Sequence, residues 1–185
     1  MSEIAEALRL HVSSGQKIQL ERGAFDHSHW NGYPLAVNHR FVLVRTLDDF
    51  DFDGFAVLRV EDLTAVYAGD PENFFDQVLR AEGLLESLPP APELRLDSWQ
   101  TVLEDVRRLS GYAIVECEAH VDPEFYLGRL IEISAEHVAL RYINVAGLIE
   151  EDLTHVPLED ITMVRFDERY IRYFAKYAKD ERVTH

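Results

Sequence analysis

The stretch VEDLTAVY at residues 60–67 has a counterpart without gaps in LEDITMVR at residues 158–165. The two stretches share a Glu-Asp pair, a Thr and a Val, with apolar residues matched around them. Matches continue outward at nearly the same spacing and pair Gly32 with Gly128 and His39 with His137. A repeat of this length is far longer than a solenoid unit, so the sequence predicts two copies of one domain.

A proline-rich stretch separates the two copies. Residues 88–92 read LPPAP, and prolines this dense form a semi-rigid spacer rather than a loose tether. We therefore expect a first domain over residues 1–88, a linker over 89–96 and a second domain over 97–185.

Hydrophobic periodicity and turn signals predict a helix, five short strands and a second helix in each copy. Among these signals, Asp53-Gly54 is a favoured hairpin dipeptide, and Asp70-Pro71-Glu72 is typical of a helix start. Five antiparallel strands are too few for a two-sheet sandwich, so we expect each copy to bend into a small five-stranded barrel flanked by its helices. The expected helices are about 2–12, 70–87, from 98 and from 168, and the expected strands are about 17–21, 32–37, 41–47, 55–60, 63–67, 112–119, 126–134, 137–143, 154–157 and 161–166.

The run FYLGRLIEI at residues 125–133, followed by HVAL at 137–140, resembles the second and third strands of Sm-like barrels. That fold also begins with a helix and has a short turn between its fourth and fifth strands. The resemblance implies two tandem Sm-like (SH3-like) barrels. The loops at 134–136 and 157–160 lack the Asp-Asn and Arg-Gly or Lys-rich pairs of RNA-binding Sm proteins, so RNA binding is not implied.

The whole chain also resembles a set of bacterial proteins built as the same tandem. The shared features are Asp97-Ser98, the strand around Gly128, and LEDIT at residues 158–162 running toward a short helix. This resemblance covers both copies but implies no activity, because none is established for that set.

Composition limits the classes of partner. The formal net charge is −16, from 18 basic and 34 acidic residues. Such a chain repels phosphate backbones and anionic membranes unless its basic residues cluster, so we expect neither nucleic acid nor membrane as a partner. No apolar run approaches membrane-spanning length, residues 1–10 are amphipathic rather than a signal peptide, and the single Cys117 fits a reducing compartment. We therefore expect a cytoplasmic protein.

Residues 49–54, DFDFDG, match the front of a calcium-binding loop through Asp49, Asp51 and Asp53. Such a loop needs a bidentate Glu at its twelfth position, where this chain has Val60. The flanking residues also predict strands rather than helices. We therefore favour a solvated hairpin whose two phenylalanines turn inward, and calcium binding by these aspartates is the alternative.

His27 and His29 lie in a polar loop and could supply two nitrogen ligands to zinc. No third His or Cys follows at metal spacing, so a polar surface loop is the favoured interpretation. We expect no bound metal and no cofactor.

Tyr170, Tyr173 and Tyr177 recur at helical spacing on the last helix. The ordinary interpretation is core packing, and the alternative is a contact surface between copies or protomers, where aromatic residues are favoured. No nucleophile elbow, phosphate-binding glycine loop or His-Glu-x-x-His motif occurs in the sequence, so we expect no enzyme.

We expect instead a binding or scaffold protein that acts through protein–protein contacts, with a homo-oligomer compatible with this role. An acidic inhibitor or immunity-type protein that neutralises a basic partner is the first alternative. A small-ligand binder or enzyme that uses a groove between the copies is the second.

Overall fold

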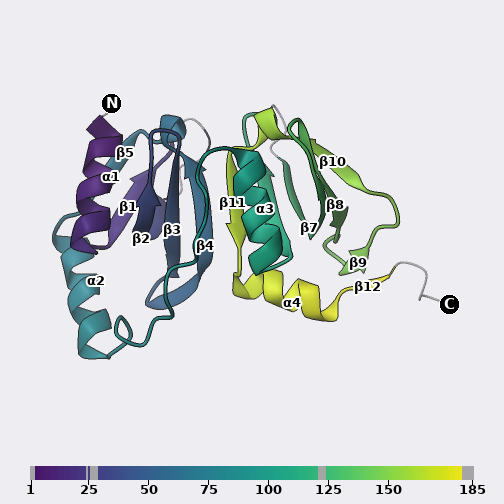
Figure 1. Cartoon of the computed structure of the whole chain (residues 1–185). Coiled ribbons are helices and arrows are strands. Elements are labelled where there is room, and N and C mark those ends of the chain that lie inside the picture. Colours follow the sequence, from purple (N-terminus) through teal and green to yellow (C-terminus); the bar gives the residue numbers. More distant parts are fainter. Residues whose placement is uncertain (1–2, 24, 26–28, 121–123, 181–185) are drawn as a thin grey trace. The chain divides into compact units, whose positions relative to one another are not determined.

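The computed structural model describes residues 3–23, 25, 29–120 and 124–180 (Figure 1). It is mainly β, with antiparallel strands and helices, and it divides into two compact units, Met1–Leu96 and Asp97–His185. Residues 89–96, expected as a linker, therefore belong to the first unit. Each unit is described by itself. In the part of the chain that the structure describes, no helix is long and apolar enough to cross a membrane.

The first unit begins with a helix, continues through five strands and ends with a second helix. Its strand order is β4-β3-β2-β1-β5, and each neighbouring pair is antiparallel. The elements are α1 (Glu3–Ser14), β1 (Ile18–Glu21), β2 (His29–Val37), β3 (Phe41–Asp48), β4 (Asp51–Arg59), the 3₁₀ helix η1 (Val60–Asp62), β5 (Ala65–Tyr67) and α2 (Asp70–Ala81).

The second unit follows the same plan with two additions, the short strands β9 and β12, which pair in parallel. Its main strand order is β10-β8-β7-β6-β11, again antiparallel. The elements are α3 (Trp99–Leu109), β6 (Tyr112–Cys117), β7 (Glu124–Ile133), β8 (His137–Tyr142), β9 (Leu148–Ile149), β10 (Thr154–Pro157), the 3₁₀ helix η2 (Leu158–Asp160), β11 (Met163–Phe166), α4 (Arg169–Tyr177) and β12 (Lys179–Asp180).

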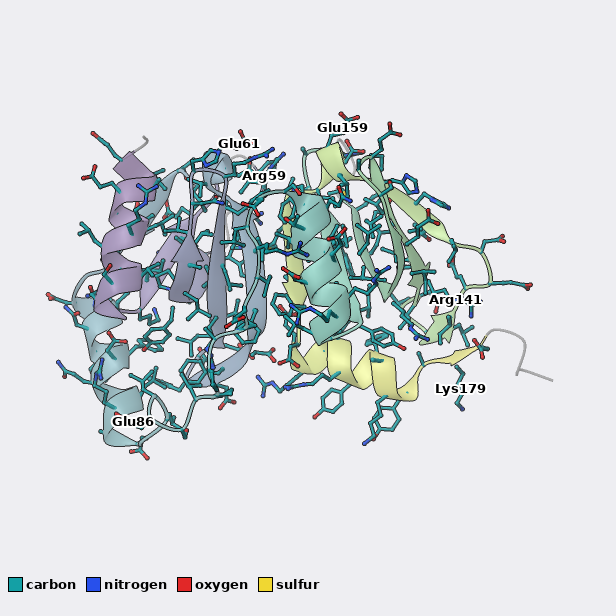
Figure 2. All side chains as sticks on the ribbon, in the orientation of Figure 1. Arg59, Glu61, Glu86, Arg141, Glu159 and Lys179 are labelled. Atoms are coloured by element: carbon teal, nitrogen blue, oxygen red, sulfur yellow. The ribbon has the colours of Figure 1, made fainter. Side chains whose placement is uncertain are left out.

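The strands do not close into the five-stranded barrels that the sequence predicted. In the first unit, η1 carries the chain from β4 to β5, and β5 then pairs with β1 instead of β4. In the second unit, η2 likewise carries the chain from β10 to β11, which pairs with β6. Within each described unit the strands therefore form an open series, because β4 does not pair with β5 and β10 does not pair with β11. Figure 2 shows Glu61 and Glu159 at these two 3₁₀ turns.

The core of each unit comes from the apolar side chains of its strands and first helix. In β1, Ile18 and Leu20 are fully buried while their neighbours are partly exposed, as an alternating strand requires. In α3, Val102, Leu103 and Val106 are fully buried on one helix face. Each unit thus has its own hydrophobic core.

Two glycines occupy equivalent places in the two units. Gly32 on β2 pairs with Thr46 on β3, and Gly128 on β7 pairs with Tyr142 on β8. A Cβ atom on Gly32 would lie 2.1 Å from the carbonyl oxygen of Arg45, and one on Gly128 would lie 2.3 Å from that of Arg141. No side chain fits at either distance, so both positions require glycine.

The threonines of the two quoted stretches also make matching hydrogen bonds. The hydroxyl of Thr64 donates to the Glu21 carbonyl oxygen at 3.2 Å, and that of Thr162 donates to the Glu116 carbonyl oxygen at 3.1 Å. Their backbone N–H groups donate to the same carbonyls at 2.8 and 2.9 Å. Each threonine therefore fixes the chain beside the first strand of its unit after the 3₁₀ turn.

The two histidines matched from sequence do not coincide in the structure. His39 lies in the turn between β2 and β3, whereas His137 is the first residue of β8. The matching pair is Asn38 and Ser134, because each side-chain oxygen accepts two backbone N–H groups of the following turn. This turn requires only a short polar side chain at that position. The histidines matched in the sequence therefore do not occupy equivalent positions in the two units.

The hairpin between β3 and β4 turns at Asp49-Phe50, not at Asp53-Gly54 as expected. Asp49 adopts a left-handed conformation with φ of 54°. Gly54, with φ of 74°, lies instead on β4 beside a register shift between Arg45 and Leu47. The glycine therefore accommodates a β-bulge rather than a tight turn.

Candidate binding surface on helix α4

The start of α4 is fixed by a partly buried ion-pair network. Arg165 on β11 donates to Glu168 through Nε and Nη2, at 2.8 and 2.6 Å, and to Glu116 on β6 through Nη1, at 2.7 Å. Burial by itself lowers the pKa of Arg165, but the hydrogen bonds and charges of Glu168 and Glu116 outweigh it and raise that pKa. Because Asp167 takes a left-handed turn with φ of 57°, α4 leaves the strand at a defined angle.

The inner face of α4 joins the core of the second unit. Ile171 is buried against Ile114, Leu127 and Ile143, and Phe174 packs against the same cluster. After the helix, the Lys179 N–H donates to the Gly147 carbonyl oxygen at 2.9 Å, which begins the β12–β9 pairing. Both ends and the inner face of α4 are therefore held in place, so its outer face is a preorganised surface.

The outer face of α4 carries three tyrosines. Tyr170, Tyr173 and Tyr177 are 44%, 62% and 64% exposed, and their spacing places them along one side of the helix. The Tyr170 ring lies 4.6 Å from the Phe174 ring, measured between centroids, which limits its motion. Core packing, the ordinary interpretation of this aromatic stripe, thus applies to Phe174 and Ile171 but not to the tyrosines.

Basic residues run beside the tyrosines, and one directly precedes each of the three in the sequence. Arg169, Arg172 and Lys176 lie on α4, which contains no Asp or Glu. Lys176 Nζ lies 5.0 Å above the Tyr177 ring centroid, a cation–π distance. Arg172 Nη1 is 3.6 Å from Asp167 Oδ1, but both groups are half exposed, so this pair is weak and can yield to a stronger carboxylate. We call the exposed side chains of Tyr170, Arg172, Tyr173, Lys176 and Tyr177 the α4 surface.

More basic side chains lie near the C-terminal end of the helix. Figure 2 shows Lys179, just beyond α4, and Arg141 at the same end of the second unit. Arg141 Nη1 is 4.0 Å from Asp180 Oδ1, again between exposed groups. The chain has a net charge of −16, yet all three charged side chains of α4 are basic.

The calcium candidates are not brought together as ligands. Asp49 lies in the hairpin turn, while Asp51 and Asp53 lie on β4. Phe50 stacks on Phe75 of α2 with ring centroids 4.4 Å apart, but it is still 38% exposed and so is not turned fully inward as the sequence predicted. Among the residues that the structure describes, no three His, Cys, Asp or Glu side chains are grouped in a way that could hold a metal ion.

The zinc candidates fall partly outside the described residues, because His27 is among those not described. His29 begins β2, and its Nδ1 lies 3.4 Å from Glu21 Oε1 in a largely exposed pair. That geometry is an ordinary surface contact between neighbouring strands.

Sequence reasoning identified the tyrosines but not the basic residues as part of the same surface. The signal was present, because Arg169, Arg172 and Lys176 repeat at the helical spacing that the tyrosines follow. Aromatic and apolar residues separate these three basic residues in the sequence, so they do not form a run of like charge. Only the helical arrangement shows that the two sets share one exposed side.

Comparison with known proteins adds no further constraint: the chain matches no protein-family model, no curated protein and no solved structure.

Proposed function

We propose that this protein is a binding protein whose α4 surface takes an acidic segment of another protein. The observation that carries the proposal is the combination of three exposed tyrosines and three basic residues on a fixed helix without a carboxylate. Tyrosine and arginine are the residue types that most often dominate binding energy at protein interfaces. No enzymatic activity and no cofactor are part of this proposal.

The charge of the α4 surface favours an acidic partner over a neutral one. A carboxylate that reaches Arg172 or Lys176 forms a charge-assisted hydrogen bond, while apolar parts of the partner cover the tyrosine rings. Elsewhere the acidic chain repels a negative partner, but at physiological salt this repulsion is screened beyond about 8 Å. Acidic surface elsewhere therefore repels the segment at short range but does not keep it away from α4.

Nucleic acid is a poorer fit for the same surface. A nucleic-acid strand carries a charge at every phosphate, and α4 supplies only three basic residues within a chain of net charge −16. A short acidic segment carries fewer charges over a greater length and can place apolar side chains between them. We therefore propose a protein partner in the cytoplasm, where the buried thiol of Cys117 would remain reduced.

A peptide-binding experiment on the full chain tests the proposal. The probe is a fluorescein-labelled peptide in which Glu and Leu alternate, and its binding is followed by fluorescence anisotropy. We expect saturable binding that the double variant Tyr173→Ala/Lys176→Ala weakens about tenfold or more, as loss of an interface hot spot does. The matched control Tyr67→Ala/Arg107→Ala, which removes one exposed tyrosine and one positive charge elsewhere, should bind like the wild type.

Three outcomes would contradict this function. They are no saturable binding, equal loss in both double variants, and stronger binding of a single-stranded RNA oligonucleotide of similar length. Preference for a peptide with Lys in place of Glu, unaffected by the α4 substitutions, would favour the alternative of an acidic inhibitor of basic partners.

We also propose that the two units are two copies of one Sm-like module. Support comes from the shared strand order, the leading helix, and the 3₁₀ turn that precedes β5 in the first unit and β11 in the second. The matching environments of Gly32 and Gly128, and of Thr64 and Thr162, point the same way. An experimental structure in which the two units superpose strand for strand is the result expected.

A further inference from the structure

The first unit contains a pocket of about 300 Å³ that plays no part in the proposed function. It lies among the end of α1, strands β2 and β3, helix α2 and the segment that follows α2 (marked by Glu86 in Figure 2). Apolar side chains that include Leu35, Leu85 and Leu88 form most of its wall. A volume of this size lies at the lower end of the range for small-molecule sites.

The polar residues of the pocket are all uncharged or positive. They are Tyr33, Arg45 and Arg80, and no Asp or Glu is among the lining residues. Acidic residues outnumber basic ones by 34 to 18 in the chain, so a pocket with two arginines and no carboxylate is a marked local reversal.

Arg45 carries a buried positive charge. It is only 5% exposed, its Nη2 donates to the Pro89 carbonyl oxygen at 2.8 Å, and its Cζ lies 5.1 Å from the Phe55 ring centroid. In the described part of the chain, no carboxylate forms an ion pair with it. Burial therefore lowers the pKa of Arg45 without any opposing charge. A buried charge that has no counter-charge is costly, and an anion in the pocket would offset that cost.

The other two polar residues complete this environment. Arg80, on α2, is exposed and close enough for its charge to act on the Tyr33 phenol. The Tyr33 hydroxyl donates to Asp76, which also accepts the Lys17 N–H at 3.4 Å. Asp76 is thus engaged outside the pocket lining, and Arg45 and Arg80 remain available to an anion.

We propose that this pocket binds a small carboxylate with an apolar body, such as a medium-chain fatty acid. The guanidinium of Arg45 would hold the carboxylate at the inner end, because guanidinium and carboxylate form paired, charge-assisted hydrogen bonds. Arg80 adds a second positive charge, and Leu35, Leu85 and Leu88 contact the apolar body. The segment containing Leu85 and Leu88 forms one side of the pocket.

Octanoate binding to the full chain, measured by calorimetry and by the shift in melting temperature, tests the proposal. We expect saturable binding to the wild type and a rise in melting temperature. Arg80→Gln should weaken the affinity about tenfold, the loss typical of one charge-assisted contact. Arg45→Met should abolish binding and still fold, because methionine fills similar space without a buried charge.

The controls separate this site from non-specific effects. Octan-1-ol has the same apolar body without the charge and should not bind measurably. Arg107→Gln, on α3 in the second unit, removes the same charge as Arg80→Gln and should bind octanoate like the wild type. If octanoate does not bind, if it binds Arg80→Gln as tightly as the wild type, or if inorganic phosphate binds as tightly as octanoate, the proposal is overturned. None of these results bears on peptide binding at α4, so the two proposals can fail separately.

Discussion

Gly32 and Gly128 provide a direct test of close backbone approach in both units. Adding a methyl group at either position places it against a backbone carbonyl and against the side chain of Val44 or Leu140, both 2.7 Å away. Because the carbonyl belongs to the next strand and cannot rotate away, the strands must separate. We expect Gly32→Ala and Gly128→Ala each to lower the free energy of unfolding by about 1–3 kcal/mol, measured by urea denaturation.

Gly23→Ala is the matched control for these variants. A Cβ atom there would lie 3.4 Å from Thr64 Oγ1, an ordinary contact, and Gly23 has no positive φ that would strain alanine. Its stability should change by less than about 0.5 kcal/mol. An equal loss of free energy of unfolding at all three positions would show that close backbone approach is not the reason for glycine at positions 32 and 128.

We predict that the buried Cys117 thiol makes the free energy of unfolding fall at high pH. Burial, followed by the negative charges of Asp160, Glu124, Glu116 and Glu118, raises the pKa of Cys117 from 9.0 to about 12. In the unfolded chain the thiol ionises above pH 9, whereas in the folded chain it stays protonated. The contribution of the protonated thiol to the free energy of unfolding is therefore fully present below pH 9. It is lost as the pH rises toward 12, by roughly 1 kcal/mol per pH unit.

Comparison with Cys117→Ala isolates this contribution from other groups that titrate at high pH. The free energy of unfolding of the wild type should fall more steeply between pH 9 and 11 than that of the variant. The cavity left by the variant adds a constant offset, so the slopes are compared and not the absolute values. Parallel slopes would mean that the thiol ionises equally in the folded and unfolded states.

At the scale of elements, helices and strands could be predicted where local signals act alone. Helix α3 begins near residue 98 as expected, and Ser98 caps it, because its Oγ accepts the Thr101 N–H at 3.2 Å. The alternation of Ile18 and Leu20 marked β1 correctly. Helix α2 was expected to reach about residue 87 but ends at Ala81, because Gly83 takes a positive φ that stops the helix earlier.

Features that depend on contacts between distant segments could not be predicted. Strands β9 and β12 are two residues each, and they pair with each other where Lys179, just after α4, meets Gly147. The open strand series likewise depends on the pairing of β5 with β1 and of β11 with β6. Sequence periodicity carries no information about which strands pair.

The candidate sites divide in the same way. The tyrosines of α4 were visible from their spacing, but only the packing of Ile171 and Phe174 shows which side faces outward. The pocket could not be predicted at all. Its walls come from residues between Val12 and Ala91 that are far apart in sequence, and in the sequence Arg45 resembles any polar residue in a strand.

At the scale of the whole molecule, the division after Leu96 separates two units that each have a buried core. The proline-rich segment belongs to the first unit because it is held there. The Pro89 carbonyl accepts from Arg45, and the Leu96 carbonyl accepts from the Asn38 side chain at 2.5 Å. The second unit therefore begins cleanly at Asp97, next to the Ser98 cap of α3.

This boundary predicts that residues 97–185 fold when expressed alone. The fragment keeps the α3 cap, the core around Leu103 and Val164, and the network of Arg165, although a unit of this size is close to the lower limit for an independent domain. We expect cooperative thermal unfolding by far-ultraviolet circular dichroism. We also expect Cys117, buried in the full chain, to resist alkylation by iodoacetamide in the folded fragment. Because alkylation needs an exposed thiolate, rapid labelling of the fragment but not of the full chain would show that the second unit depends on the first for its core.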